Sequence, residues 1–173
     1  MKIIAIFGPK NSGKTFIATK LIEYFSKKRN VIAIKHVCKR TFDFDIKGKD
    51  SWRMKRAGAI ASIVISPMRV GIVWDFNESL NPIDTVLKLC ELFKSKPDII
   101  IVEGFRYLLA QREDVLKIVC LRSEEDVEEY LSKIKHPVIC VLGGKFSGNI
   151  PRDLPAIRIM EMEKLIKIIE SKL

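Results

Sequence analysis

The amino end of the chain carries a glycine-rich loop between a predicted strand and a predicted helix. Residues 8–15 read Gly-Pro-Lys-Asn-Ser-Gly-Lys-Thr, a complete match to the phosphate-binding pattern G-x-x-x-x-G-K-S/T. The apolar run at residues 2–7 predicts a buried strand before the loop. Apolar residues recur at helical spacing after it, at Phe16, Ile17, Leu21, Ile22 and Phe25. Because a helix that starts here aims its free N–H groups at an anion, the sequence predicts a nucleoside triphosphate site.

Each residue type of this loop has a predicted part in holding phosphate and Mg²⁺. Glycines at 8 and 13 permit turn conformations closed to larger residues, so that successive N–H groups of residues 11–15 form an anion nest. The ammonium of Lys14 would lie between the β- and γ-phosphates, which makes Lys14 a predicted catalytic residue. The hydroxyl of Thr15 is a hard oxygen ligand of the kind that Mg²⁺ prefers. The predicted nucleotide-binding residues of the loop are Gly8, Asn11, Ser12, Gly13, Lys14 and Thr15.

Length and composition predict one soluble domain that spans residues 1–173. The chain is 47% hydrophobic, which is enough for a sizeable core. No segment approaches the roughly 18 apolar residues that span a membrane, so we predict no membrane partner. Met1-Lys2-Ile3 enters a strand at once and carries no cleavage-site pattern, so we expect no secretory signal. A cytoplasmic location follows by default.

The cysteines predict buried thiols rather than disulfides or a zinc site. The four cysteines are Cys38, Cys90, Cys120 and Cys140. They are widely spaced and form no C-x-x-C pair, and three of them lie in apolar runs. His36 and Cys38 form a pair of potential soft ligands, but a zinc site needs further ligands.

The formal net charge of +10 predicts an affinity for polyanions. The anion could be a nucleic acid, an acidic protein or a phosphorylated small molecule. The sequence has no aromatic RNA-binding signature and no obvious recognition helix, so nucleic acid is a minor hypothesis.

Alternation of strands and helices predicts an α/β fold of the P-loop NTPase class, with three layers, a mostly parallel sheet and helices on both faces. The predicted strands are residues 2–7, 31–34, 59–65, 70–74, 98–102, 115–121 and 138–142. The predicted helices follow the loop at residue 15 and cover residues 51–57, 82–93, 124–134 and 162–173. A turn at residues 67–69 makes the third and fourth strands a β-hairpin. Asn81 is the predicted N-cap of its helix, and residues 123–126 are a predicted capping box.

The carboxyl ends of the strands select the remaining candidate residues, because ligands of open α/β sheets bind there. The clusters at this edge are residues 35–36, 103–106 and 143–145, together with the polar insertion 39–55. Glu103 follows four apolar residues, where a P-loop protein places the acid that orients Mg²⁺ waters or a nucleophile. We therefore predict Glu103 as a catalytic and metal-binding residue. The alternative is a strand-end cap bonded to the backbone of the loop.

Two further stretches resemble the MobB family, the adaptor proteins of molybdopterin guanine dinucleotide biosynthesis. Residues 35–53 and 57–59 are similar to the family pattern K-H-x-x-H-x-F-x-x-D-x-x-G-K-D-S-x-R-x-x-x-A-G-A. Residues 102–105 are similar to its V-E-G-F motif. Where many members carry a second histidine, this chain has Lys39 and Arg40. The resemblance implies binding of GTP with Mg²⁺, weak hydrolysis, a homodimer and a partnership with MobA, the guanylyltransferase that attaches GMP to molybdopterin.

The basic insertion could hold the phosphate of a pterin ligand, molybdopterin or its guanine dinucleotide, or the acidic surface of a partner. Its cations are Lys35, His36, Lys39, Arg40, Lys47, Lys49, Arg53, Lys55 and Arg56, of which we select Lys35, His36, Lys49 and Arg53 as cofactor-binding. Asp45 aligns with the family's acidic position and is the third predicted metal ligand beside Thr15 and Glu103. A solvated loop carboxylate is the alternative for Asp45. Asp50 is the predicted N-cap of the helix at 51–57.

Guanine selectivity has no motif of its own, because no N-K-x-D sequence occurs. Gly143-Gly144-Lys145 follows a strand where base-recognition loops lie, and the stem of Lys145 could stack on a purine. A glycine turn without a ligand is the alternative. GTP rather than ATP therefore comes from the resemblance alone.

Two classes of function remain open. The first is a slow GTPase that acts as an adaptor in molybdenum cofactor maturation, in which Arg106 is a candidate to reach the γ-phosphate. The second is a small-molecule kinase whose basic insertion serves as an acceptor site or lid. Nucleic-acid binding, a third hypothesis, predicts an affinity that falls steeply with salt.

Overall fold

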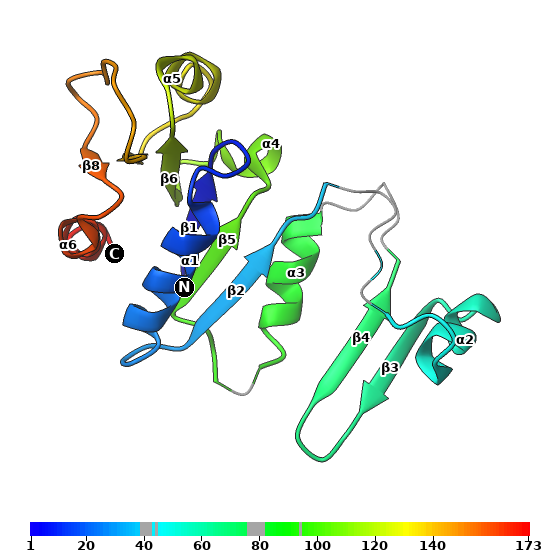
Figure 1. Ribbon diagram of the computed structural model, residues 1–173. Helices are drawn as coiled ribbons and strands as arrows, with labels where there is room; N and C mark the ends of the chain where they lie inside the picture. The colour runs from blue at the N-terminus through cyan, green and yellow to red at the C-terminus, as the bar shows by residue number, and fades with distance from the viewer. Residues whose placement is uncertain (39–42, 44, 76–81, 94) are drawn as a thin grey trace. The chain divides into compact units, whose positions relative to one another are not determined.

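The fold is described by a computed structural model that covers residues 1–38, 43, 45–75, 82–93 and 95–173 (Figure 1). The chain divides into two compact units. The first unit comprises residues 1–36 and 87–173, and the second comprises residues 37–86. The single domain expected from composition therefore stays a prediction. No helix in the described ranges is long and apolar enough to span a bilayer.

The first unit is built on a parallel sheet, as predicted. Its strands are β1 (Lys2–Phe7), β2 (Val31–Lys35), β5 (Ile99–Glu103), β6 (Val115–Leu121), β7 (Val138–Leu142) and β8 (Ala156–Arg158). In the described part of the chain the order is β2-β5-β1-β6-β7-β8, and every neighbouring pair is parallel. The helices are α1 (Lys14–Phe25), α4 (Arg106–Leu109), α5 (Glu124–Leu131) and α6 (Met162–Glu170), while α3 (Pro82–Cys90) crosses the boundary between the units.

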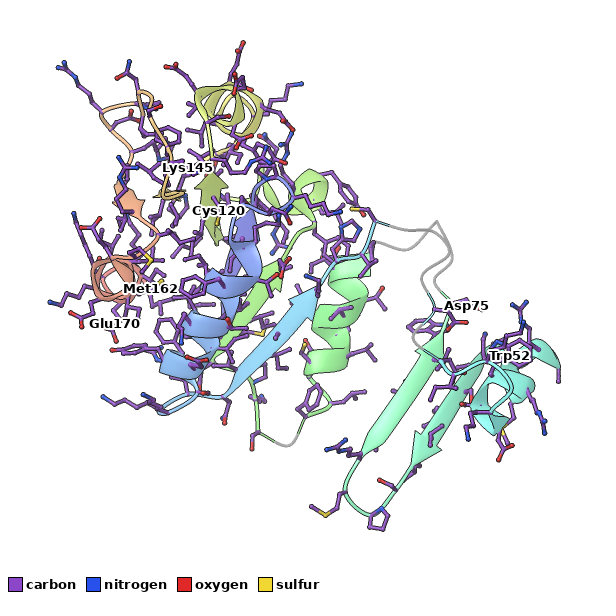
Figure 2. The ribbon with its side chains drawn as sticks, viewed as in Figure 1. Trp52, Asp75, Cys120, Lys145, Met162 and Glu170 are labelled. Carbon is purple, nitrogen blue, oxygen red and sulfur yellow. The ribbon has the colours of Figure 1, made fainter. Side chains whose placement is uncertain are left out.

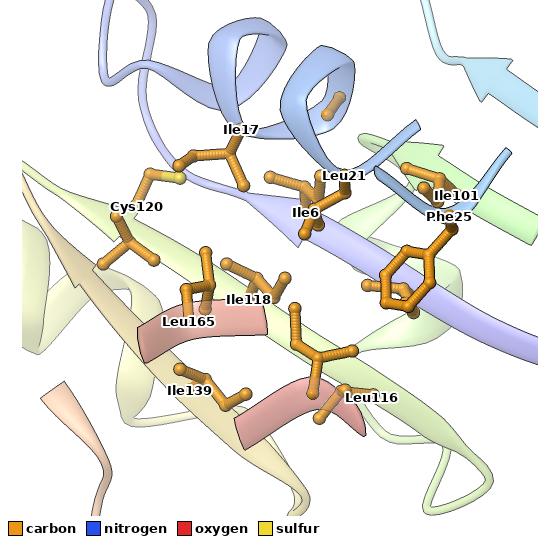
Figure 3. Close-up of a cluster of buried hydrophobic side chains, with 14 of the residues drawn as sticks. Ile6, Ile17, Leu21, Phe25, Ile101, Leu116, Ile118, Cys120, Ile139 and Leu165 are labelled. Carbon is orange, nitrogen blue, oxygen red and sulfur yellow. The ribbon is translucent and has the colours of Figure 1, made fainter. Parts of the chain in front are cut away.

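One face of this sheet is covered by α1 and α6. Ile17 and Leu21 of α1 and Leu165 of α6 pack with strand residues such as Ile6 and Ile118 in one buried cluster (Figure 3). Strand residues that point to the opposite face are also buried, and there α4 contacts β1 and α5 contacts β6. Burial on both faces explains why β1, β5 and β7 read as nearly continuous apolar runs.

A lysine lies in this core. Lys117 of β6 has no exposed surface, and its ammonium donates to the carbonyl oxygens of Arg112 and His136. Burial lowers the pKa of Lys117.

Cys90, Cys120 and Cys140 are buried free thiols, as predicted, whereas the prediction is wrong for Cys38, which is exposed. Burial raises the pKa of Cys120 and of Cys140 to about 12.

Several helix predictions need correction. Phe16 does not belong to the buried face of α1 but is 42% exposed. The helix expected to reach residue 93 ends at Cys90, and Phe93 is exposed; its predicted cap, Asn81, lies outside the described residues. The predicted capping box is confirmed in part: Ser123 is the N-cap of α5 and its backbone N–H bonds the Asp126 carboxylate, but the Ser123 hydroxyl makes no cap, and Asp126 also accepts from the backbone N–H of Arg122.

The second unit is a helix and a hairpin. β3 (Ala61–Ile65) pairs antiparallel with β4 (Val70–Trp74), and the Arg69 carbonyl accepts a hydrogen bond from the Ser66 N–H across the predicted turn. α2 (Asp50–Arg56) contacts β3. The predicted N-cap of α2 is off by one residue, because Lys49 occupies that position and Asp50 is the first helical residue.

Lys55 joins the parts of the second unit. Its ammonium donates to the carbonyl oxygens of Ala59 and Ile60 and lies 2.8 Å from Asp75. Figure 2 labels Asp75 and, on α2, Trp52, whose ring lies 5.3 Å from the guanidinium of Arg56. The side chain of Lys55 is only 14% exposed, so this member of the basic insertion stabilises the fold of its own unit.

Candidate phosphate-binding site

The glycine-rich loop joins the end of β1 to the start of α1, as predicted. Gly8 has a φ of +142° and Gly13 a φ of +87°, which side chains rarely adopt. A Cβ on Gly8 would lie 2.4 Å from the carbonyl oxygen of Cys120, and one on Gly13 would lie 2.4 Å from Cδ1 of Ile159. Both positions therefore favour glycine for backbone conformation, and Gly8 also requires it for space, because its close neighbour is a backbone oxygen.

The loop lines a pocket of about 390 Å³. Its walls are Lys10, Asn11, Ser12, Gly13, Lys14, Thr15, Phe16, Lys35 and Glu103. The pocket is lined by all of the predicted loop residues except Gly8. It is also lined by Lys35 and Glu103, the charged residues that end β2 and β5. Phe16, which sequence periodicity assigned to the core, belongs to this wall instead.

The carboxylate of Glu103 is held on both oxygens. Thr15 Oγ1 donates to Glu103 Oε2 at 2.8 Å, and Lys35 Nζ donates to Glu103 Oε1 at 2.7 Å. Lys35 and Glu103 are direct neighbours in the register of β2 and β5. The carboxylate therefore bonds side chains here, whereas the alternative of a strand-end cap would have it bonded to the loop backbone. Its position beside the Thr15 hydroxyl fits a group that orients a water on Mg²⁺.

The ammonium of Lys14 donates to the carbonyl oxygen of Pro9 within the loop. Burial lowers the pKa of Lys14, the charge of Glu103 opposes that shift, and the charge of Lys35 adds to it. The two ammonium groups are thus close enough to interact electrostatically.

The hydroxyl of Ser12 fits an oxyanion in this pocket. Ser12 is 5% exposed, and its Oγ has no hydrogen-bond partner among the described residues. A buried hydroxyl without a partner is costly, and a phosphate oxygen would satisfy it. Together with the glycine-only backbone at residues 8 and 13, this donor makes the loop a suitable cradle for phosphate.

A second pocket, of about 340 Å³, adjoins the other side of the loop. Residues 11–13 line both pockets, and the second pocket adds Arg122, Gly143, Gly144, Lys145 and Ile159. Lys145, labelled in Figure 2, thus lines a pocket that adjoins the loop, and its role in base recognition stays a prediction. Arg122 was not among the predicted site residues.

Arg122 is fixed by a buried carboxylate. Its Nε and Nη2 donate to the two oxygens of Asp126 at 3.0 and 3.1 Å, and its Nη1 donates to the carbonyl oxygen of Lys10 at 3.1 Å. Asp126 is 4% exposed, and the guanidinium lowers the pKa of its carboxyl group. The only signal in the sequence was the position of Arg122 directly after β6.

His36 is not in the lining of either pocket. Its ring centroid lies 4.3 Å from that of Phe105, and a Cβ on Gly104 would lie 2.8 Å from His36 Cβ. Burial lowers the pKa of His36. The structure thus packs the residue pair 35–36 on residues 103–105, so the two family-like motifs form one contact.

The remaining predicted site residues belong to the second unit. Asp45 Oδ1 accepts hydrogen bonds from the Ser51 hydroxyl at 2.8 Å and the Ile46 N–H at 2.9 Å. Lys49 and Arg53 are exposed. Lys39 and Arg40 lie outside the described residues. Within the described ranges no three His, Cys, Asp or Glu side chains gather to hold a metal ion. Metal binding by Asp45 therefore stays a prediction.

Comparison with known proteins decides the family. The model of the MobB family, described as molybdopterin guanine dinucleotide synthesis protein B, matches residues 3–143. The chain belongs to the MobB family. A molybdopterin-guanine dinucleotide biosynthesis adapter protein of Haemophilus influenzae is 31% identical to this MobB-family chain over 135 residues, which cover 75% of the chain and 71% of that protein.

Two further proteins show the same similarity. A putative adapter protein of the same biosynthesis from Methanocaldococcus jannaschii is 28% identical over 125 residues, 72% of this chain. The match spans only about half, 49%, of that relative. The crystal structure of Bacillus subtilis MobB superposes with a TM-score of 0.78 at 21% identity, covering 100% of this chain and 98% of that one. At this identity the likeness shows the fold, which agrees with the predicted P-loop NTPase class.

Proposed function

We propose that this MobB-family chain binds GTP with Mg²⁺ at the loop of residues 8–15 and acts as an adapter in molybdopterin guanine dinucleotide biosynthesis. One observation carries the proposal: Thr15, Glu103 and the loop backbone converge on one pocket in a chain whose family match begins at residue 3. Residues 8 and 11–15 would hold the phosphates. Thr15 and Glu103 would hold Mg²⁺, which would supply positive charge to offset the negative charge of the phosphates.

The second pocket supports a nucleotide rather than free phosphate as the ligand. Because residues 11–13 line both pockets, a nucleoside triphosphate can place its phosphates on one side of them and its base on the other. The guanidinium of Arg122 and the stem of Lys145 offer flat and apolar surfaces for a purine. Guanine rather than adenine remains an inference from the family.

Slow hydrolysis is part of the proposal. Glu103 would orient the attacking water, which is the step that a positioned carboxylate can assist. Arg106, the candidate for contact with the γ-phosphate, instead lies 4.3 Å from the ring of Tyr130 and 3.6 Å from Glu129. It is absent from the lining of the phosphate pocket. Since no arginine among the described residues lines the phosphate pocket, turnover should be weak.

The adapter role would use the second unit. Lys47, Lys49 and Arg53 are exposed there and could hold a pterin phosphate or the acidic surface of a MobA-like guanylyltransferase. We further propose that residues 1–173 act together as one nucleotide-binding domain, as the composition predicts.

A homodimer would bury the hairpin. One face of the hairpin carries Ile63 and Ile65 of β3 opposite Ile72 and Val70 of β4, and these side chains are 46 to 75% exposed. An isolated two-stranded hairpin is marginally stable in water, so such a face needs a cover. A second copy would supply an identical apolar face across a two-fold axis.

Calorimetric titration tests the proposal. We expect saturable binding of Mg·GTP, weaker binding of Mg·ATP, and slow release of phosphate. A kinase would instead transfer label from the γ-phosphate of GTP or ATP to an added metabolite. Binding that disappears at moderate salt and requires polynucleotide would favour the nucleic-acid hypothesis. Absence of any nucleotide binding by the intact chain would overturn the proposed function.

A further inference from the structure

Lys35 lies at the end of the phosphate pocket that is farther from the second pocket. The strand order places β5 and then β2 on one side of β1, and β6 and then β7 on the other. Lys35 ends β2, whereas Arg122 and Gly143 follow β6 and β7. A nucleotide whose base occupies the second pocket must therefore run across residues 11–13 toward β5 and β2. Its terminal phosphate would point toward Lys35.

The geometry holds the ammonium of Lys35 toward the pocket. Lys35 Nζ lies 2.7 Å from Glu103 Oε1, and the Glu103 side chain is only 14% exposed. The side chain of Lys35 is 58% exposed, and the residue lines the pocket. An ammonium has three N–H donors, and the structure gives one of them to Glu103. The rest of the ammonium can therefore serve an anion in the pocket without breaking the ion pair.

Charge balance favours a role at the terminal phosphate. Without Mg²⁺, a γ-phosphate placed beside Glu103 would meet a like charge in a partly buried pocket, which is unfavourable. An ammonium that contacts both anions removes that repulsion. Lys14 is positioned by the loop itself and would contact a nucleoside diphosphate as well as a triphosphate. Lys35 ends β2, which lies two strands from β1, so it would contact only the terminal phosphate of a triphosphate.

We propose that Lys35 is a specificity-determining residue that recognises the γ-phosphate and so lets this protein distinguish a nucleoside triphosphate from a diphosphate. The proposal rests on the proposed nucleotide binding. On this proposal, Lys35 contacts the nucleotide only when a γ-phosphate is present. Lys35 directly precedes His36, whose ring packs on that of Phe105.

The test compares wild type, Lys35→Met and Lys28→Met by calorimetry with a non-hydrolysable GTP analogue and with GDP, each with Mg²⁺ and with EDTA. Lys28→Met is a matched control, because Lys28 is an exposed lysine after α1 that lines neither pocket. We expect Lys35→Met to weaken triphosphate binding by about tenfold to a hundredfold, the worth of a hydrogen bond between charged groups, while GDP affinity changes less than about twofold. The loss should persist in EDTA, because the contact does not pass through the metal.

Each other result has a defined meaning. If wild type binds neither nucleotide, the proposed function and this inference fall together. If wild type binds both and Lys35→Met weakens both equally, or neither, nucleotide binding stands and the inference is wrong. A loss confined to the Mg²⁺ experiments would mean that Lys35 acts only through Glu103 and the metal, which also overturns it. Lys35→Gln, neutral but polar, replaces the methionine variant if that variant fails to fold.

Discussion

The two units of the chain bury their apolar residues to very different degrees. In the first unit, residues such as Ile4, Ile6 and Ile118 have no exposed surface. In the second unit, Ile63 is 60% exposed and Ile65 is 75% exposed. All lining residues of the candidate phosphate pocket belong to the first unit, whereas the second presents exposed apolar side chains, on which the proposed dimer rests. The comparison predicts that ligand binding and assembly can be disrupted separately.

The strongest expected effect is loss of nucleotide binding in Lys14→Ala. Removing the ammonium leaves the phosphates without the cation that the loop positions, so affinity for GTP should fall by at least about a hundredfold. Calorimetry measures the affinity, and Lys27→Ala is a control at an exposed lysine outside both pockets. The variant should keep the oligomeric state of the wild type. Undiminished affinity would show that the loop is not the phosphate site.

Substitutions in the hairpin should disrupt the dimer without affecting nucleotide binding. The double variant Ile63→Lys and Ile72→Lys puts two charges opposite each other on the exposed apolar face, so a dimer that buries this face should dissociate. Since burying one such side chain stabilises by about 1.5–3 kcal/mol, the dimerisation constant should fall by at least about a hundredfold. Sedimentation velocity measures the dimer.

Met68→Lys is the matched control for the hairpin experiment. Met68 is 89% exposed in the turn, beyond the paired strands. It should leave the dimer intact, and both hairpin changes should leave GTP affinity unchanged. A wild-type chain that is monomeric at all accessible concentrations would show that the apolar face serves something other than a second copy.

A smaller effect is expected from Glu103→Gln. The amide keeps a side-chain oxygen for the Thr15 hydroxyl but is a poor base, so phosphate release should slow by about tenfold to a hundredfold while binding remains. Single-turnover hydrolysis with labelled GTP measures the rate. Unchanged turnover would make Glu103 a structural residue that holds Thr15 and Lys35.

Much of the first unit could be predicted because its elements are long and locally specified. The strand at residues 115–121 and the one at 138–142 are continuous apolar runs, and the structure has the same bounds. β8 and α4 were missed, since three and four residues are too few to show a period. The burial of Lys117 could not be predicted from the sequence. Its ammonium donates to the backbone carbonyl oxygens of Arg112 and His136, and no sequence motif marks these two acceptors.

The residues of the candidate site also differ in how far the sequence predicts them. The loop was predictable because its chemistry lies within eight consecutive residues, and Lys35 and Glu103 because each ends a strand. Arg122 directly follows the strand at residues 115–121 and so met the same criterion, but it was not selected; its bonds to the buried Asp126 and to a backbone carbonyl of the loop are seen only in the structure. The Arg122–Asp126 pair is local, four residues apart, whereas the contact of Arg122 with the Lys10 carbonyl joins residues that only the assembled sheet brings together.

The smallest predicted effect concerns His36, which packs on Phe105 beside the phosphate site. Burial lowers the pKa of His36 in the folded chain, so between that pKa and the ordinary value of 6.5 the unfolded chain binds more protons. The free energy of unfolding should therefore fall as the pH drops below 6.5, and His36→Phe, which cannot take up a proton, should lose this component. Urea denaturation at neutral and mildly acidic pH measures the difference, and His136→Phe is the control because that histidine is largely exposed. An equal pH response of wild type and His36→Phe would contradict this prediction. It would mean that water reaches the imidazole and that His36 does not pack tightly against Phe105.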